Sequence, residues 1–321
     1  VPRATEYVEQ IVGLIAELIA KDAAYATDDG IYMSTSVVAD YGLLAHQNID
    51  DMLAGGGDRT VFGADQKKHP ADFVLWKFSK PGEPSWASPW GEGRPGWHSE
   101  CVVMSLELLG EGFDLHCGGA DLRFPHHENE RAQAVALGKD FAHHWMHNGF
   151  VVDTEGEKMS KSLGNVTNLV DLVQHYDPRA YRMLLLQTHY RSPVKVGQDN
   201  IDAAVNSLAG LDGFANRMAN ASLPTAEPDA TVIAQFRTYM DNDLDTSSAM
   251  ALIFDAVRRA NIAAETGDSA TTAALASAVT EMTHALGLKL RAGNDIDTAI
   301  VERANALDAA RKAKDFAQAD A

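Results

Sequence analysis

The sequence has few cysteines and few basic residues, and it lacks any long apolar run. Its 321 residues include two cysteines, Cys101 and Cys117, too few for a disulfide framework, so each is expected to be a metal ligand or a buried thiol. No stretch approaches the roughly 18 consecutive apolar residues that cross a bilayer, which excludes a membrane-embedded chain. Lysine and arginine number 27 against 45 aspartates and glutamates, for a net charge of −18. This charge disfavours indiscriminate nucleic-acid binding, which depends on cations, but leaves room for a local basic face.

The overall composition of the chain is typical of a globular protein. With 45% hydrophobic and 22% charged residues the chain can bury a core, and its length favours two or three domains. The N-terminus, Val1-Pro2-Arg3, carries no basic leader or signal-type apolar segment. We therefore expect a cytoplasmic protein, and we expect this chain to be an internal fragment of it.

The N-terminal half carries the patterns of both helices and strands. The helical spacing of its apolar residues predicts a helix over 5–21. Strands are predicted over 24–27, 31–34 and 72–77, and the stretch 51–70, with its three consecutive glycines, is predicted to be a loop.

A strand, a glycine turn and a helix are predicted in succession in the middle of the chain. The stretch 113–116 is typical of a short buried strand, and 117–121 contains two glycines that would let the backbone approach a ligand. A helix is predicted over 126–137, with Pro125 in its first turn. This succession indicates an α/β sheet layer with ligands at the carboxyl ends of its strands.

After Asn200 the composition becomes alanine-rich with helical periodicity, which predicts a helical bundle. Pro224 and Pro228 mark the break between its first two helices, because proline neither fits a helix interior nor donates a backbone hydrogen bond. The predicted helices span 201–218, 230–240, 247–266 and 271–286.

A metal site is predicted from His126 and Glu130, which are four residues apart and would project from one face of a helix. Cys101 is the expected third ligand, since thiolate, imidazole and carboxylate all bind zinc. The metalloprotease helix needs a histidine at position 131, where this chain has Arg131, so a zinc protease is disfavoured. A closed zinc site needs a fourth group, which the sequence leaves open among Cys117, His116, His127, a water, a substrate atom and a residue outside this chain.

Three tryptophans, Trp86, Trp90 and Trp97, lie in an irregular segment rich in proline. They either cover the edge of the core or line a substrate pocket, and the sequence favours neither interpretation.

The lysine-rich segment Lys158-Met159-Ser160-Lys161-Ser162 predicts chemistry with ATP. Its two ammonium groups flank a small polar loop, which suits a departing pyrophosphate because cations stabilise the charge that grows on the phosphates.

Three segments occur in the order found in cysteinyl-tRNA synthetases, and the similarity runs nearly end to end. They are Pro95-Gly96-Trp97-His98-Ser99-Glu100-Cys101, Phe124-Pro125-His126-His127-Glu128-Asn129-Glu130, and Lys158-Met159-Ser160-Lys161-Ser162. The chain therefore resembles this family of class I aminoacyl-tRNA synthetases.

The resemblance implies an α/β fold, in which a partial Rossmann-like catalytic domain with an inserted α+β connective region precedes an α-helical bundle. The implied limits are 1–165 for the partial catalytic domain, about 10–92 for the insertion, 166–200 for a stem-contact region and 201–321 for the bundle. The implied enzyme is a monomer that joins L-cysteine to ATP, with Mg²⁺, to form cysteinyl-adenylate, and then passes the cysteinyl group to tRNA(Cys).

The resemblance also implies roles for individual residues. Cys101, His126 and Glu130 match zinc ligands, Trp97 matches the tryptophan of the cysteine pocket, and Lys161 matches the lysine of the ATP loop, in which Lys158 would also neutralise the leaving phosphates. The nucleotide-binding turn is matched by Gly119 and Asp121.

The sequence departs from the family in two motifs. The His-Ile-Gly-His signature and an upstream zinc-ligating cysteine do not occur in it, and both would precede Val1. We therefore expect the chain alone to be a poor or inactive catalyst. Cys117 stands where the family usually has glycine, so its role stays open.

The sequence also allows two functions other than that of a cysteinyl-tRNA synthetase. A cysteine ligase of the mycothiol pathway shares the ATP loop and the zinc chemistry but uses an amino sugar as acceptor. A non-catalytic zinc-containing interaction module would bind metal without ATP.

Overall fold

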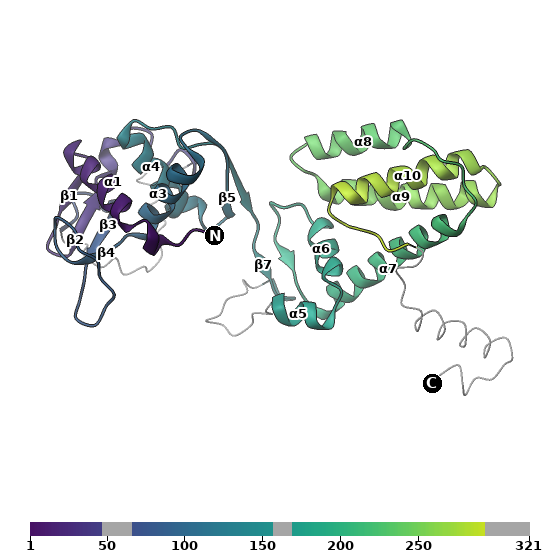
Figure 1. Cartoon of the computed structure of the whole chain (residues 1–321), viewed down its shortest axis with the longest axis horizontal. Helices are drawn as coiled ribbons and strands as arrows, with labels where there is room; N and C mark the ends of the chain where they lie inside the picture. The colour runs from purple at the N-terminus through teal and green to yellow at the C-terminus, as the bar shows by residue number, and fades with distance from the viewer. Residues whose placement is uncertain (47–65, 157–168, 293–321) are drawn as a thin grey trace. The chain divides into compact units, whose positions relative to one another are not determined.

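The computed structural model describes residues 1–46, 66–156 and 169–292 (Figure 1). It divides into two compact units, Val1–Asn148 and Gly149–Ala321. The lysine-rich segment from Lys158 to Ser162 and most of the predicted 51–70 loop lie outside the described residues. No helix within the described ranges is long and apolar enough to span a membrane.

The first unit contains an antiparallel sheet of four strands in the order β1-β2-β3-β4. The strands are β1 (Ala24–Ala26), β2 (Gly30–Met33), β3 (Phe73–Phe78) and β4 (Gly93–Pro95). All three strands predicted in this region are confirmed, each within a residue or two of its predicted limits. The two central strands, β2 and β3, are rich in the β-branched and aromatic residues that favour strands, and Gly30 directly follows the tight turn between β1 and β2.

Three helices pack together in the first unit. They are α1 (Val8–Ala20), α3 (Trp97–Leu109) and α4 (Glu128–Leu137). A one-turn 3₁₀ helix, Ala4–Glu6, precedes α1, so the helix predicted over 5–21 is confirmed with a break near its start. Helical spacing puts Ile11, Ile15 and Leu18 on one face of α1, and all three are fully buried.

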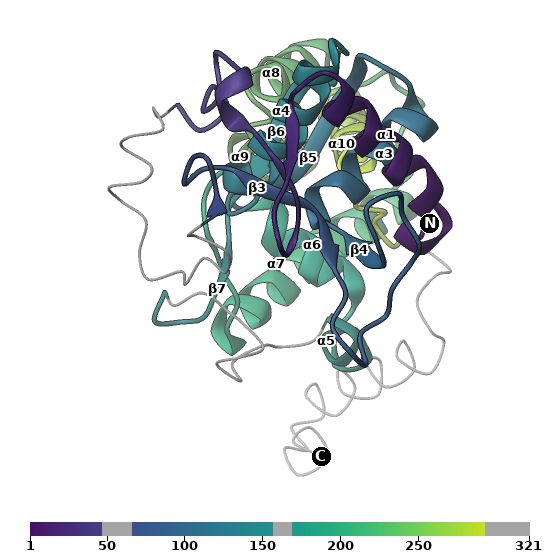
Figure 2. The same cartoon turned by 90° about the vertical axis from the view of Figure 1, so that its left-hand side faces the viewer.

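Two parallel strands, β5 (Phe113–Gly119) and β6 (Ala142–Asn148), lie side by side in the same unit (Figure 2). The prediction that a turn begins at Cys117 is wrong, because Cys117 pairs with Met146 and the strand continues to Gly119. Backbone pairing with β6 overrides the local preference of two glycines for a turn. The turn therefore begins three residues later than predicted, after Gly119.

The helix predicted over 126–137 also begins later than expected. Residues Arg123–His127 form an irregular turn, with Phe124 in an extended conformation (φ −140°, ψ 135°), and the regular helix α4 begins at Glu128. Proline disfavours the helical conformation in the residue before it, which explains the extended Phe124. Pro125 therefore lies in the turn that leads into the helix rather than in the first turn of the helix.

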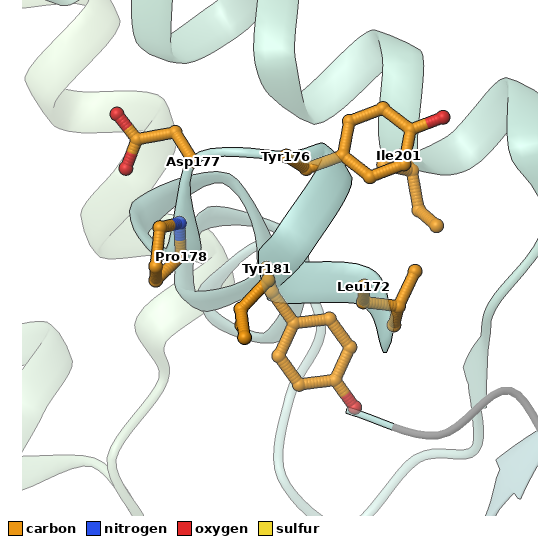
Figure 3. A pocket seen from close by; sticks show the side chains of 7 residues that line it. Leu172, Tyr176, Asp177, Pro178, Tyr181 and Ile201 are labelled. Atoms are coloured by element: carbon orange, nitrogen blue, oxygen red, sulfur yellow. The ribbon is translucent and has the colours of Figure 1, made fainter. Parts of the chain in front are cut away.

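The second unit begins with two short parallel strands and two short helices. The strands are β7 (Val151–Val152) and β8 (Val194–Lys195), and the helices are α5 (Leu169–His175) and α6 (Pro178–Leu186). A small cleft beside these two helices is lined by Leu172, Tyr176, Asp177, Pro178 and Tyr181, and by Ile201 of the helix that follows β8 (Figure 3). Its volume of about 10 Å³ leaves room for one water molecule, so it is no site for a nucleotide or an amino acid.

The remainder of the second unit is the predicted helical bundle. Its helices are α7 (Gln198–Asn220), α8 (Ala230–Asp241), α9 (Thr246–Glu265) and α10 (Ser269–Ala285). Small buried alanines let α9 and α10 pack side by side along their lengths (Figure 1). An aspartate caps the N-terminus of each of the last three helices by accepting backbone N–H bonds; these are Asp229, Asp245 and Asp268.

A cluster of charges fastens the segment that follows α10 to the bundle. The guanidinium of Arg179 donates to both carboxylate oxygens of Asp212, at 2.8 and 2.9 Å, and to both of Asp177, at 2.7 and 3.2 Å. It also donates to the carbonyl oxygen of Lys289 at 2.8 Å, and the backbone N–H of Arg291 donates to Asp212 at 2.8 Å. Hydrogen bonds from Arg179 lower the pKa of Asp177.

Replacing this arginine by methionine, Arg179→Met, is expected to lower the free energy of unfolding by roughly 1.5–3 kcal/mol, the usual value of a hydrogen bond to a charged group in a partly buried setting. Urea denaturation would measure the change. The matched control is Arg258→Met, which breaks the exposed pair Arg258–Asp255 and should cost less than about 1 kcal/mol. Equal losses in the two variants would contradict a fastening role for Arg179.

Candidate metal and substrate site

The site is built from the first turns of α3 and the start of α4. Gly96 begins α3 directly against β3: a Cβ at this position would lie 2.2 Å from the carbonyl oxygen of Val74, so only glycine fits. Trp97 and Cys101 follow at a spacing of four residues and share one face of α3. The close approach at Gly96 therefore places the start of α3, the part of the helix that carries both side chains, against the sheet.

The three predicted metal ligands come together in the structure. Cys101, His126 and Glu130 each offer one potential ligand atom, and these three atoms lie within 4.8 Å of one another. His126 Nε2 is 2.7 Å from Glu130 Oε1, and the Glu130 side chain is fully buried. The structure thus brings the three predicted residues together, with His126 in the turn before α4 rather than on the helix itself, and their role as metal ligands stays a prediction.

A second group of potential ligands shares the same carboxylate. His116, His127 and Glu130 also have ligand atoms within 4.8 Å of one another, and His116 Nε2 is 2.7 Å from Glu130 Oε2. Both histidines are among the potential ligands that the sequence leaves open, but the sequence gives no sign that Glu130 contacts both groups. Among the described residues neither group contains Cys117, which is exposed on β5.

The buried carboxylate controls the charges of the site. Burial acts to raise the pKa of Glu130, but hydrogen bonds from His116 and His126 outweigh it and lower the pKa to about 2. Burial, reinforced by the nearby charge of Glu130, raises the pKa of the Cys101 thiol to about 12. Burial also lowers the pKa of His98 to about 4. At neutral pH the metal-free site therefore contains an ionised carboxylate and a protonated thiol beside it.

Trp97 lies over this cluster, whereas the other two tryptophans do not. Its ring centroid is 4.0 Å from that of His126, and 59% of its surface is exposed. Trp86 and Trp90 pack against the core of the first unit. Trp86 and Trp90 therefore cover the core, whereas the part of Trp97 in a substrate pocket stays a prediction.

The predicted nucleotide-binding residues lie at the carboxyl end of β5. Gly119 is the last residue of the strand, and its carbonyl oxygen accepts the N–H of Leu122 at 2.9 Å. A Cβ at Gly119 would lie 2.6 Å from Oδ1 of Asp121, so the two positions are in close contact. The neighbouring Gly118 leaves room for the His127 ring, since a Cβ there would lie 2.7 Å from its Cε1. Their part in binding ATP stays a prediction.

Comparisons with known proteins identify chains related to this one. The family model for the class I (C) tRNA synthetase catalytic domain matches residues 1–206, and a DALR domain model matches 235–291. A cysteine–tRNA ligase of Lactiplantibacillus plantarum is 42% identical over 334 residues, which cover 99% of this chain and 71% of the relative. One of Halorhodospira halophila is 43% identical over 332 residues, covering 99% of this chain and 70% of the relative.

The chain belongs to the cysteine–tRNA ligases. These enzymes are class I aminoacyl-tRNA synthetases, and the chain spans about 70% of the length of the relatives above. A solved structure supports the fold: Mycobacterium tuberculosis methionyl-tRNA synthetase in complex with methionyl-adenylate matches 89% of this chain and 72% of its own, with a TM-score of 0.60 and 16% identity. The predicted fold class, a class I catalytic domain followed by helices, is confirmed.

Proposed function

We propose that this chain forms the cysteine-activating part of a cysteine–tRNA ligase. Its reaction joins the carboxylate of L-cysteine to the α-phosphate of ATP, releases pyrophosphate, and then transfers the cysteinyl group from the adenylate to tRNA(Cys). The convergence of Cys101, His126 and Glu130 beneath Trp97 is the observation that supports cysteine as the amino acid.

The ligand cluster fits a zinc ion. Thiolate, imidazole and carboxylate are all zinc ligands. Among the ion pairs of the described residues, the carboxylate of Glu130 meets only the imidazoles of His116 and His126, which leaves its buried negative charge suited to a cation. Zinc, when bound, supplies a Lewis acid that prefers a thiolate sulfur to a hydroxyl oxygen. This preference would let the enzyme discriminate cysteine from serine.

The other proposed roles belong to residues of this chain that contact the substrates. The exposed ring of Trp97 would cover the side of the cysteine molecule that faces away from the zinc ligands. Gly119 would let the backbone approach the nucleotide, and Asp121 would contact it from the turn after β5. Lys158 and Lys161 would neutralise the charge that grows on the departing pyrophosphate, together with the Mg²⁺ bound to ATP.

The helical part of the chain is proposed to serve the tRNA. The bundle and the stem-contact region would contact tRNA(Cys) through local surfaces, since the net charge of −18 disfavours contact over the whole protein. The proposed enzyme works as a monomer in the cytoplasm.

Pyrophosphate exchange in the full-length protein tests this function. Exchange is expected with cysteine and not with serine, and a zinc chelator should abolish it. Equal exchange with both amino acids would remove the proposed role of zinc. Acceptor assays with tRNA(Cys) and glucosaminyl inositol distinguish the mycothiol-pathway ligase, and metal binding without binding of a cysteinyl-adenylate analogue would indicate an interaction module.

A further inference from the structure

A continuous chain of buried polar groups lies behind the ligand cluster. The hydroxyl of Tyr41 donates to Oδ1 of Asn129 at 2.6 Å, and the backbone carbonyl of Asn129 accepts a hydrogen bond from Nε2 of Gln133 at 3.1 Å. Oε1 of Gln133 accepts in turn from the hydroxyl of Ser99 at 2.9 Å. All four residues are buried, and Ser99 and Gln133 are fully inaccessible.

This polar chain joins the two elements that supply the ligands. Ser99 lies on α3, two residues before Cys101. Asn129 and Gln133 lie on α4, where Asn129 directly precedes Glu130. The nitrogen of the Gln133 amide bonds to the backbone of its own helix, α4, which orients the amide, and its oxygen accepts from Ser99, which is the hydrogen bond that links α4 to α3.

The segment of residues 40–45 fastens α4 on both sides of Glu130. Before it, Oε2 of Glu128 accepts the backbone N–H of Leu44 at 2.8 Å. After it, the guanidinium of Arg131 binds both carboxylate oxygens of Asp40. Tyr41 of the same segment donates its hydrogen bond to Asn129. Residues 40–45 therefore bind Glu128, Asn129 and Arg131, the three residues that flank Glu130.

We propose that Tyr41, Ser99, Asn129 and Gln133 are positioning residues for the metal site, which hold Cys101 on α3 at the correct distance from His126 and Glu130. The inference rests on the proposed function, since it concerns the zinc that the site would hold. Apolar side chains alone would allow α3 and α4 to shift relative to each other with little change in contact. Directional hydrogen bonds oppose such a shift, and a small shift would reorient the sulfur relative to the carboxylate.

A purely structural role would have a different signature. Buried hydrogen bonds stabilise any fold, so their loss would lower thermal stability whether or not they position a ligand. A positioning role requires that zinc affinity falls by more than the loss of stability explains. A control that removes an equivalent hydrogen bond elsewhere in the same unit separates the two roles.

The test compares Tyr41→Phe and Gln133→Met with Tyr25→Phe in the full-length protein. Tyr25 donates to Oδ2 of Asp72 at 2.7 Å, a tyrosine–acceptor bond in the same unit but outside the polar chain. Zinc affinity is measured by competition with a chromogenic chelator. Tyr41 and Gln133 contact the neighbours of the ligands rather than the ligands, so the first two variants are expected to bind zinc up to about 10-fold more weakly, the lower end of the effect of losing a direct outer partner, and Tyr25→Phe should match the wild type.

Cobalt substitution provides a second measurement that does not depend on activity. The absorption of a cobalt–thiolate bond reports the contact of Cys101 with the metal and should weaken in Gln133→Met. If that variant does not fold, Tyr41→Phe and Ser99→Ala decide the question. Wild-type zinc affinity and cobalt spectra in the variants that fold would overturn the inference and leave the proposed function intact, as would an equal loss of zinc affinity in Tyr25→Phe. A wild-type protein that binds no zinc would overturn both.

Discussion

Replacing Glu130 by glutamine is expected to lower zinc affinity by more than about 100-fold, because even outer partners of metal ligands are worth 10- to 100-fold. The carboxylate is fully buried and ionised, with its pKa lowered to about 2, and it meets one imidazole with each oxygen. Glutamine keeps the size of the side chain but removes the charge that attracts the cation. It also turns an NH₂ group toward His116 or His126, where the carboxylate presents an acceptor.

The loss of zinc should also remove the preference for cysteine over serine in pyrophosphate exchange, since that preference is proposed to depend on the metal. Zinc content after dialysis and exchange rates with both amino acids measure the effect. The control is Glu107→Gln, which removes the same charge from the exposed end of α3 and should change neither quantity. Full zinc content in Glu130→Gln would exclude Glu130 as a ligand.

The sequence predicted the ligand cluster better than it predicted the local structure around it. The spacing of His126 and Glu130 predicts that they meet, because residues four apart share a face of a helix. In the structure His126 lies in an irregular turn, and the two side chains meet because that turn leads directly into α4. A short-range spacing rule therefore gave the correct pair from an inaccurate helix boundary.

Contacts between segments far apart in the chain could not be predicted from the sequence. Tyr41 and Asn129 are 88 residues apart, and no periodic pattern relates them. The contact of His116 with Glu130 depends on the parallel pairing of β5 with β6, which also carried the strand past the predicted turn at Cys117. Such contacts follow from the packing of elements rather than from their local preferences.

The helical bundle was predictable because its signals are local. Apolar periodicity, the two prolines of the connection before α8 and the capping aspartates each act within a few residues. The predicted helices agree with α7 to α10 within a few residues at each end. The predicted domain limits depend instead on long-range packing and stay predictions.

Replacing Lys161 by alanine is expected to slow cysteinyl-adenylate formation by roughly 10²- to 10³-fold, the usual effect of removing one group that stabilises transition-state charge. The residue lies outside the described part of the chain, so the prediction rests on the sequence of the segment and on the family to which the chain belongs. The ammonium group is proposed to act on charge that develops as pyrophosphate leaves. It should therefore contribute little to binding of the substrates before reaction.

Single-turnover adenylate formation and equilibrium cysteine binding, both in the full-length protein, separate these effects. The rate should fall while cysteine affinity and zinc content stay within about twofold of the wild type, because a lysine ammonium group does not bind zinc. The control is Lys139→Ala, which removes a surface ammonium group paired with Glu111 and should leave the rate unchanged. An unchanged rate in Lys161→Ala would exclude this lysine from activation and leave Lys158 as the cation of the segment that acts on the leaving group.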